Sequence, residues 1–202
     1  MASSKSTATQ TESRLTRRFS AGLVAIAAVV LALLVPVNPT AADDQPGQGD
    51  LAQVRRATAR YHDLDVAIAD GYQLGYRNGI ITGCIEHPTA GAMGYHYFNW
   101  DLIEDLEVDP LRPEGLVYEP TNNGGLKLVA VEWVVPQERP GRPGVTTAPS
   151  VLGLELHILN PALGWYIQHA WIWDHNPAGI YTDWNPEIDC PDGSGTPPPT
   201  SP

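Results

Sequence analysis

The sequence predicts an α+β fold, in which an N-terminal amphipathic helix packs on a curved antiparallel sheet built from one strand and two hairpins. Apolar and aromatic residues recur at helical spacing between Val54 and Ile68. Further along the chain, two pairs of runs rich in β-forming residues are each divided by a turn that contains glycine. A helix followed by runs of strands is typical of the α+β class.

The predicted helix begins at Asp50, whose side chain can cap it together with Gln53 three residues later. Its apolar pattern ends at Gly71. Residues 94–100, GYHYFNW, predict a strand because β-forming residues occupy both of its faces. Residues 101–107 then predict a short helix.

The first predicted hairpin pairs residues 114–118 with residues 126–135 across an Asn-Asn-Gly-Gly turn. Its second strand is apolar on both faces except at Lys127 and Glu132, as expected of a central strand. A carboxylate in such a strand must be paired, protonated or bound to a metal, because an isolated buried charge is strongly destabilising.

The second predicted hairpin spans residues 151–173 and turns in a five-residue loop that contains Pro and Gly. This loop length places Glu155 opposite His169 and His157 opposite Ile167. A loop one residue shorter would move His169 to the other face, so the register decides which side chains meet.

Alternation of side chains along these strands separates a core face from a polar and aromatic face. The core face carries Leu152, Leu154, Leu156, Ile158, Tyr166, Gln168, Ala170 and Ile172. The other face carries Gly153, Glu155, His157, Trp165, Ile167, His169, Trp171 and Trp173.

The ends of the chain are predicted to lie outside the fold. A basic start, an uncharged apolar run and small residues before the cleavage point predict a signal peptide over residues 1–42, cleaved near Ala42. The apolar run is shorter than the roughly 20 residues that span a bilayer, so a secreted protein without a stable membrane anchor is expected. Residues 43–49 are a predicted linker, residues 50–190 a single domain, and residues 191–202 a disordered tail rich in Pro, Gly and Ser.

The charge of the mature chain argues against some partners. Removing residues 1–42 leaves eight basic and twenty-two acidic side chains, a net charge near −14. Nucleic acid and anionic membranes are therefore not expected as partners, since phosphate binding needs clustered Lys and Arg. A metal ion or a small ligand fits this charge better.

Two cysteines, Cys84 and Cys190, remain in an exported chain. A disulfide between them is the expected outcome outside the cytoplasm. The alternatives are a thiolate metal site and a reactive thiol.

The strongest chemical signal is a group formed by Glu155, His157 and His169, which His96, Glu132 or His175 could complete, His96 being the favoured further member. Imidazole and carboxylate are ligands for Zn, Cu or Fe, and three protein ligands with one open position hold a catalytic metal. The sequence therefore predicts a metal-binding protein and leaves open whether it is an enzyme.

Two other interpretations stay open. One is a ligand pocket without a metal, lined by the polar and aromatic residues Glu132, Trp133, Trp171, Trp173 and His175. Paired carboxylates at Glu132 and Glu155 would in that case suit a glycoside hydrolase. The other is a purely structural role for the histidines and tryptophans.

Several blocks resemble a family of uncharacterised exported bacterial proteins, above all the His-x-Trp-x-Trp, Asn-Pro-x-Gly and Trp-Asn-Pro pattern that ends at Cys190. The resemblance covers most of residues 54–190 and implies export and a similar fold, but no activity. The order of the predicted elements is also similar to the cone-shaped sheet of the nuclear-transport-factor-2-like fold.

Overall fold

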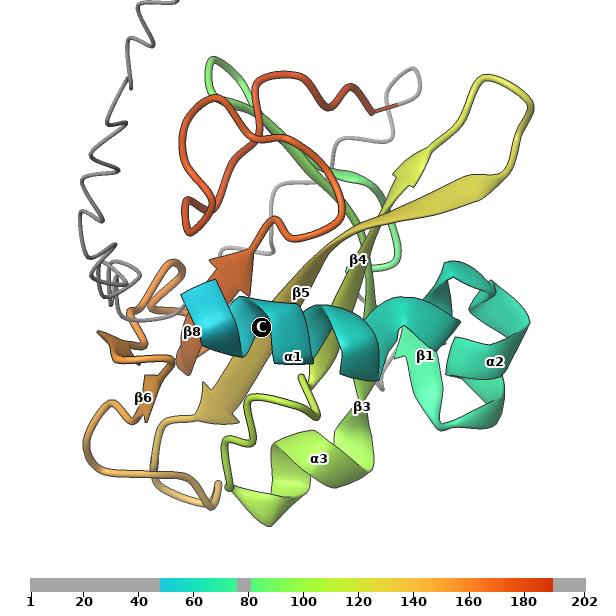
Figure 1. The fold of residues 1–202 in the computed structure, drawn as a ribbon. Coiled ribbons are helices and arrows are strands. Elements are labelled where there is room, and N and C mark those ends of the chain that lie inside the picture. The colour runs from blue at the N-terminus through green and yellow to red at the C-terminus, as the bar shows by residue number, and fades with distance from the viewer. Residues whose placement is uncertain (1–47, 76–80, 191–202) are drawn as a thin grey trace, which may run out of the picture. The chain divides into compact units, whose positions relative to one another are not determined.

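The structure is a computed structural model that describes residues 48–75 and 81–190 (Figure 1). The predicted signal peptide, most of the predicted linker and the predicted tail lie outside the described residues. In chain order the elements are α1 (Gln48–Thr58), η1 (Ala59–His62), α2 (Leu64–Ala69), β1 (Tyr72–Leu74), β2 (Ile85–His87), β3 (Gly91–Asn99), α3 (Trp100–Asp105), β4 (Gly115–Pro120), β5 (Leu126–Pro136), β6 (Ser150–Val151), β7 (Leu154–Glu155) and β8 (Trp165–Ala170).

Six strands form one antiparallel sheet in the order β1-β3-β4-β5-β8. The sixth, β2, pairs with the first residues of β3, while β1 pairs with its last residues. Strands β6 and β7 form a separate two-stranded sheet. The α+β class and the antiparallel sheet are thus confirmed, whereas the cone-shaped closure stays a prediction.

Helix α1 crosses one face of the sheet (Figure 1). Its Leu51 and Val54 are buried in the largest core cluster, which also holds Tyr118 of β4 and Leu128 and Trp133 of β5. Three smaller apolar clusters lie away from this core, and they include residues of β2 and of the chain after β8. The two faces of the sheet therefore differ, since one is closed by a helix and the other largely by loops.

The local patterns of the middle of the chain produce the expected elements. Strand β3 and helix α3 occupy the predicted strand and short helix, and Asn99 caps α3 by accepting from the backbone N–H groups of Asp101 and Leu102. Strands β4 and β5 pair as the predicted first hairpin. Gly124 adopts a φ of 80° in the turn, as a tight hairpin turn requires.

The predicted single helix from Asp50 to Gly71 is wrong, because the chain breaks into three helical pieces. The buried Thr58 turns its hydroxyl back to the carbonyl of Val54, and the chain then tightens into the 3₁₀ turn η1. Asp63 adopts an extended conformation and starts α2, accepting a hydrogen bond from the N–H of Asp65.

The predicted second hairpin is only half correct. Leu152 and Gly153 both have positive φ, so the chain reverses there and β6 pairs with β7 instead of running on beside β8. One bridge of the expected register survives, between His157 and Ile167. The other edge of β8 pairs with β5, which a hairpin interpretation of residues 151–173 could not foresee.

Cys84 and Cys190 are joined by a disulfide, with their Cα atoms 5.6 Å apart. This confirms the predicted pairing. The bridge ties the segment that leads into β2 to the end of the described chain. No helix of the described ranges is long and apolar enough to cross a membrane.

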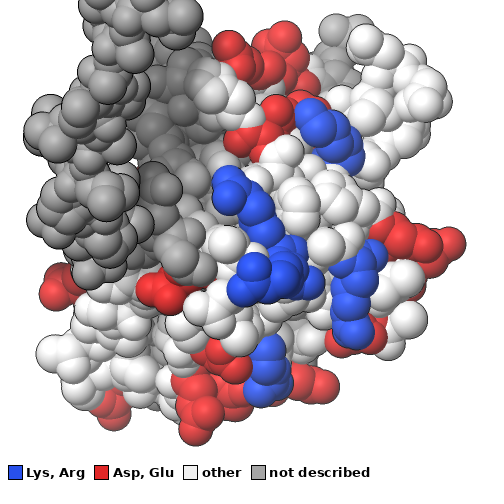
Figure 2. Space-filling model, in the orientation of Figure 1, with Lys and Arg blue, Asp and Glu red and all other residues white. Residues whose placement is uncertain are grey.

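Charge is unevenly distributed over the face that carries α1. Figure 2 shows basic side chains gathered near the middle of this face, with acidic side chains around them. The last turn of α1 supplies Arg55 and Arg56. Arg55 donates to the carbonyl of Ile172, and Arg60 pairs with Asp70, so these guanidinium groups are partly engaged within the protein. The absence of a nucleic-acid partner stays a prediction.

Candidate metal centre

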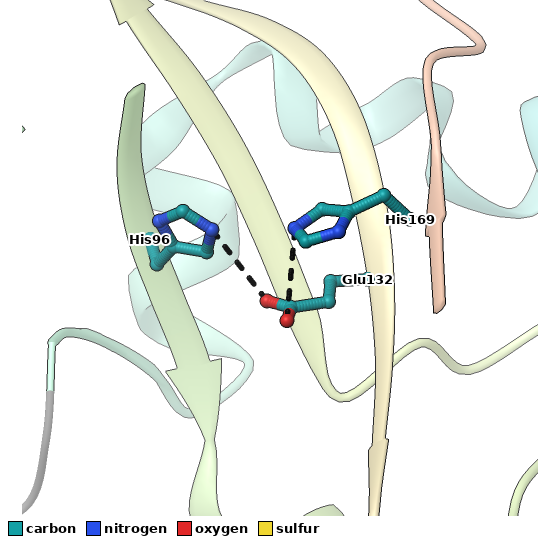
Figure 3. A group of neighbouring side chains, drawn as sticks. All are labelled: His96, Glu132 and His169. Atoms are coloured by element: carbon teal, nitrogen blue, oxygen red, sulfur yellow. Dashed lines mark ion pairs between the residues drawn. The ribbon is translucent and has the colours of Figure 1, made fainter. Parts of the chain in front are cut away.

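Three side chains with metal-ligating atoms converge from three strands (Figure 3). His96 comes from β3, Glu132 from β5 and His169 from β8. Glu132 and His169 are paired residues of the β5–β8 ladder, so they share a face. Their sequence neighbours Val131 and Ala170 belong to the core under α1, which places the three side chains on the opposite face of the sheet.

The three side chains are buried and close without being hydrogen-bonded to one another. His96, Glu132 and His169 are 2%, 4% and 0% exposed. Each imidazole Nε2 lies 3.6 Å from a different carboxylate oxygen of Glu132. A separation of 3.6 Å is too long for a hydrogen bond. The ligand atoms of all three residues lie within 4.8 Å of one another.

Gly115 allows this arrangement. Strand β4 runs between β3 and β5, so the Glu132 carboxylate reaches His96 across it. Gly115 is paired with Glu132 on one side and with Phe98 on the other. A Cβ atom at position 115 would stand 3.2 Å from both Glu132 Oε2 and a ring carbon of Phe98. The Glu132 carboxylate therefore occupies space that a side chain at position 115 would fill.

We expect Gly115→Val to destabilise the protein by about 1–3 kcal/mol, the usual cost of overpacking a closed interior, and to displace the Glu132 carboxylate from the two imidazoles. Chemical denaturation measures the first effect. The control is Gly125→Val, because Gly125 lies in the exposed turn before β5. Equal stability of the two variants would contradict the role assigned to Gly115.

Polar atoms in this group lack partners. Glu132 Oε2 and His169 Nε2, which face into the group, are buried, and no described group lies in hydrogen-bonding position to either of them. His96 turns its Nε2 atom toward Glu132 and its Nδ1 atom away from the group (Figure 3). Buried polar atoms are nearly always satisfied, because leaving one without a partner costs about 1–3 kcal/mol. The space between these side chains is therefore suited to an ion or a small polar molecule.

The protonation equilibria of the group are strongly perturbed. Burial, helped by neighbouring His169, lowers the pKa of His96 to about 3, so its imidazole is neutral at physiological pH. Burial raises the pKa of Glu132 to about 7 in spite of the nearby histidines. Burial alone would lower the pKa of His169, but Glu132 and Asp183 raise it. A neutral imidazole is the form that binds a metal.

Asp183 holds His169 from behind. One of its oxygens lies 3.1 Å from His169 Nδ1, so the Nε2 atom of the same ring is directed to Glu132. The same carboxylate binds Nε2 of the partly exposed His157 at 3.0 Å. Its hydrogen bonds to the two histidines outweigh burial and lower the pKa of Asp183. A carboxylate behind a ligating histidine is a common feature of protein metal sites, where it fixes the tautomer of the ring.

A cavity of about 40 Å³ adjoins His96 and Glu132. Apart from these two side chains and Asn160, it is lined by apolar and aromatic residues, namely Ile81, Ile85, Met93, Phe98, Leu159, Leu163, Trp165 and Ile167. The group therefore has one side that opens into a small, largely apolar space.

The structure brings together only part of the predicted metal set. His96 and His169 meet as expected, and Glu132, predicted as a pocket residue and as a possible further ligand, lies between them. Glu155 is exposed and pairs with Ser150 in the β6–β7 hairpin, so it does not face His169. The reason is that the chain reverses at Leu152 and Gly153, just before Glu155. Asp183 links His157 to the group, since its carboxylate contacts both His157 and His169.

The predicted aromatic pocket residues lie elsewhere. Trp133 is fully buried in the core under α1, and Trp171 is buried in another apolar cluster. Trp173 donates its indole N–H to Thr58, and His175 is exposed. Trp171, Trp173 and His175 line a separate pocket, and none of the four side chains lines the cavity beside the histidines.

Sequence reasoning missed two contributors, Asp183 and Gly115. Asp183 follows a turn twelve residues after Trp171 and carries no local signal, since Asp is ordinary in such turns. Gly115 stands at the start of a predicted strand, where glycine is disfavoured, and this was the one available hint of a close approach.

Comparisons with protein-family models, with curated proteins and with solved structures find no match to this chain. The similarity to exported bacterial proteins therefore stays a prediction.

Proposed function

We propose that the protein binds one transition-metal ion through His96, Glu132 and His169. The observation that carries this proposal is that the Nε2 atoms of both histidines face the carboxylate of Glu132 at 3.6 Å, too far for hydrogen bonds, while Glu132 Oε2 and His169 Nε2 are buried without a partner among the described residues. A metal ion between them would satisfy the carboxylate and both imidazoles at once. It would also offset the cost of keeping an ionised carboxylate in the interior.

The ligand set favours Zn, Fe or Cu. A set of two imidazoles and one carboxylate suits calcium and magnesium poorly, because these ions prefer oxygen ligands. Ligand atoms about 2.1 Å from a shared tetrahedral zinc ion stand roughly 3.4 Å apart. The two N···O separations of 3.6 Å are close to that value.

Three protein ligands leave at least one position of the metal open, as in catalytic zinc and iron sites. His96 and Glu132 line the adjoining cavity, so an external molecule would approach from that side. Asp183 holds the His169 ring on the other side. Such a metal acts as a Lewis acid or activates a bound molecule.

We also infer that the protein works outside the cytoplasm. The disulfide supports this location, since such bridges persist in oxidising compartments. The signal-peptide pattern of residues 1–42 supports it independently.

Metal analysis of protein purified without a His-tag tests the proposal. Metal-free protein titrated with Zn, Fe(II) or Cu(II) is expected to bind one equivalent, and His96→Ala and His169→Ala are expected to lose it. Asp183→Asn is expected to fold and to bind about 10–100-fold more weakly, the usual effect of removing the partner of a ligating histidine.

The matched control is His175→Ala, because this exposed histidine pairs only with Glu187 among its described neighbours. It should bind as wild type does. Near-ultraviolet circular dichroism confirms that each variant is folded. Failure of the wild type to bind any of the three metals stoichiometrically, or retention of the metal in folded His169→Ala, would refute the proposal.

A further inference from the structure

We propose that the cavity beside the metal centre admits a neutral molecule of two or three heavy atoms, of the size and polarity of a diatomic gas, and excludes larger ligands. This inference rests on the proposed metal site for its coordination step. It concerns what reaches the open position of the metal, and three features of the cavity carry it.

The first feature is volume. The cavity holds about 40 Å³. A cavity of roughly 150 Å³ holds benzene, whereas one water needs roughly 10–15 Å³. The available space therefore corresponds to a few atoms, which is too little for a sugar, an amino acid or an aromatic ring.

The second feature is the chemistry of the walls. Two apolar clusters meet there, one containing Phe98, Trp165 and Ile167, the other containing Ile85 and Met93. Leu159 and Leu163 pack against both clusters. An ion held in the apolar part of this space would lose its hydration without compensation. A neutral, weakly hydrated molecule meets no such cost.

The third feature is the position of the cavity relative to the candidate metal ligands. His96 and Glu132 line the cavity, whereas His169 does not and is held from its far side by Asp183. The polar end of the cavity is thus the candidate metal centre itself. A molecule inside it contacts mainly hydrocarbon and adjoins the metal ligands.

Xenon binding to the metal-free protein tests the cavity separately from the metal. We expect xenon to occupy it, measured by xenon NMR or by a xenon-pressurised crystal. Ile167→Phe and Leu163→Phe, which fill the space from a strand and from a loop, should each lose the xenon signal. The control Ile68→Phe, at an isoleucine that is 51% exposed, should keep it. Absence of xenon from the wild type would overturn the inference even if metal binds.

Nitric oxide binding to the iron(II)-loaded protein tests the coordination step. We expect the electron paramagnetic resonance signal of an iron–nitrosyl in the wild type, its loss in folded Ile167→Phe that retains iron, and no spectral change with imidazole. A spectral response to imidazole, or none to nitric oxide in the iron-loaded wild type, would overturn the inference. Xenon binding without any metal binding would instead overturn the proposed function and leave an apolar cavity with no coordination role.

Discussion

Glu132→Gln is expected to abolish metal binding while leaving the metal-free protein at least as stable as the wild type. Gln has nearly the shape of Glu, so packing against Gly115 and Phe98 is preserved. It lacks the negative charge that a metal ion requires. The loss of affinity should exceed the roughly 10–100-fold effect of changing a residue behind a ligand, as isothermal titration calorimetry will measure.

The stability of this variant should differ from wild type in a pH-dependent way. Burial raises the pKa of Glu132 from 4.5 in its ordinary state to about 7 in the folded protein. The folded protein therefore holds this proton more tightly than the unfolded chain, and stability is lost as the pH rises from about 4.5 towards 7. Gln has no such proton, so the advantage of the metal-free variant should grow over that interval and then level off.

Glu114→Gln is the matched control. Glu114 is also buried, and burial raises its pKa to about 9, but its carboxylate accepts from the N–H of Val134 and does not join the histidines. A glutamine there can still accept that bond, so metal affinity should be unchanged. Metal affinity that falls equally in both variants would show that any change to a buried carboxyl group matters, and not the one at Glu132 in particular.

The elements that sequence patterns predicted are those decided by local physics. The β4–β5 hairpin follows from glycine in its turn, and α3 begins where Asn99 can cap it. Alternation along β8 also placed Ile167 and His169 on a different face from Ala170, as the structure has it. Each of these features depends on residues close together in the chain.

The features that were missed depend on distant pairing. Leu152 has a φ of 52°, which is unusual for a leucine and gives no warning in the sequence. It reverses the chain and moves Glu155 away from β8. Glu132 faces His169 from the opposite edge of β8, where β5 pairs. The residue types of the candidate site were thus predictable, whereas the carboxylate that stands opposite His169 depends on a strand pairing that the sequence pattern does not reveal.

Loss of the Cys84–Cys190 disulfide is expected to have the largest effect on stability. The bridge joins residues 106 apart in sequence. Closing a loop of that length restricts the unfolded chain, and the chain-entropy model gives about 4.7 kcal/mol. Comparison of oxidised wild type with Cys84→Ala/Cys190→Ala by urea denaturation measures the difference. Alanine is preferred to serine because Cys84 is fully buried and a hydroxyl there would add a polar group to the interior.

The same double variant should bind metal more weakly, because the bridge holds together two segments that pack near the candidate site. Cys84 precedes Ile85, which lines the cavity, and Cys190 packs on the cluster that contains Ile188. Metal at 100 times its dissociation constant for the variant should restore roughly 2.7 kcal/mol of stability, since it binds only the folded form. This metal-dependent gain in stability should vanish when His169→Ala is added to the double variant. A double variant as stable as wild type, or metal rescue that survives His169→Ala, would contradict this coupling between bridge and site.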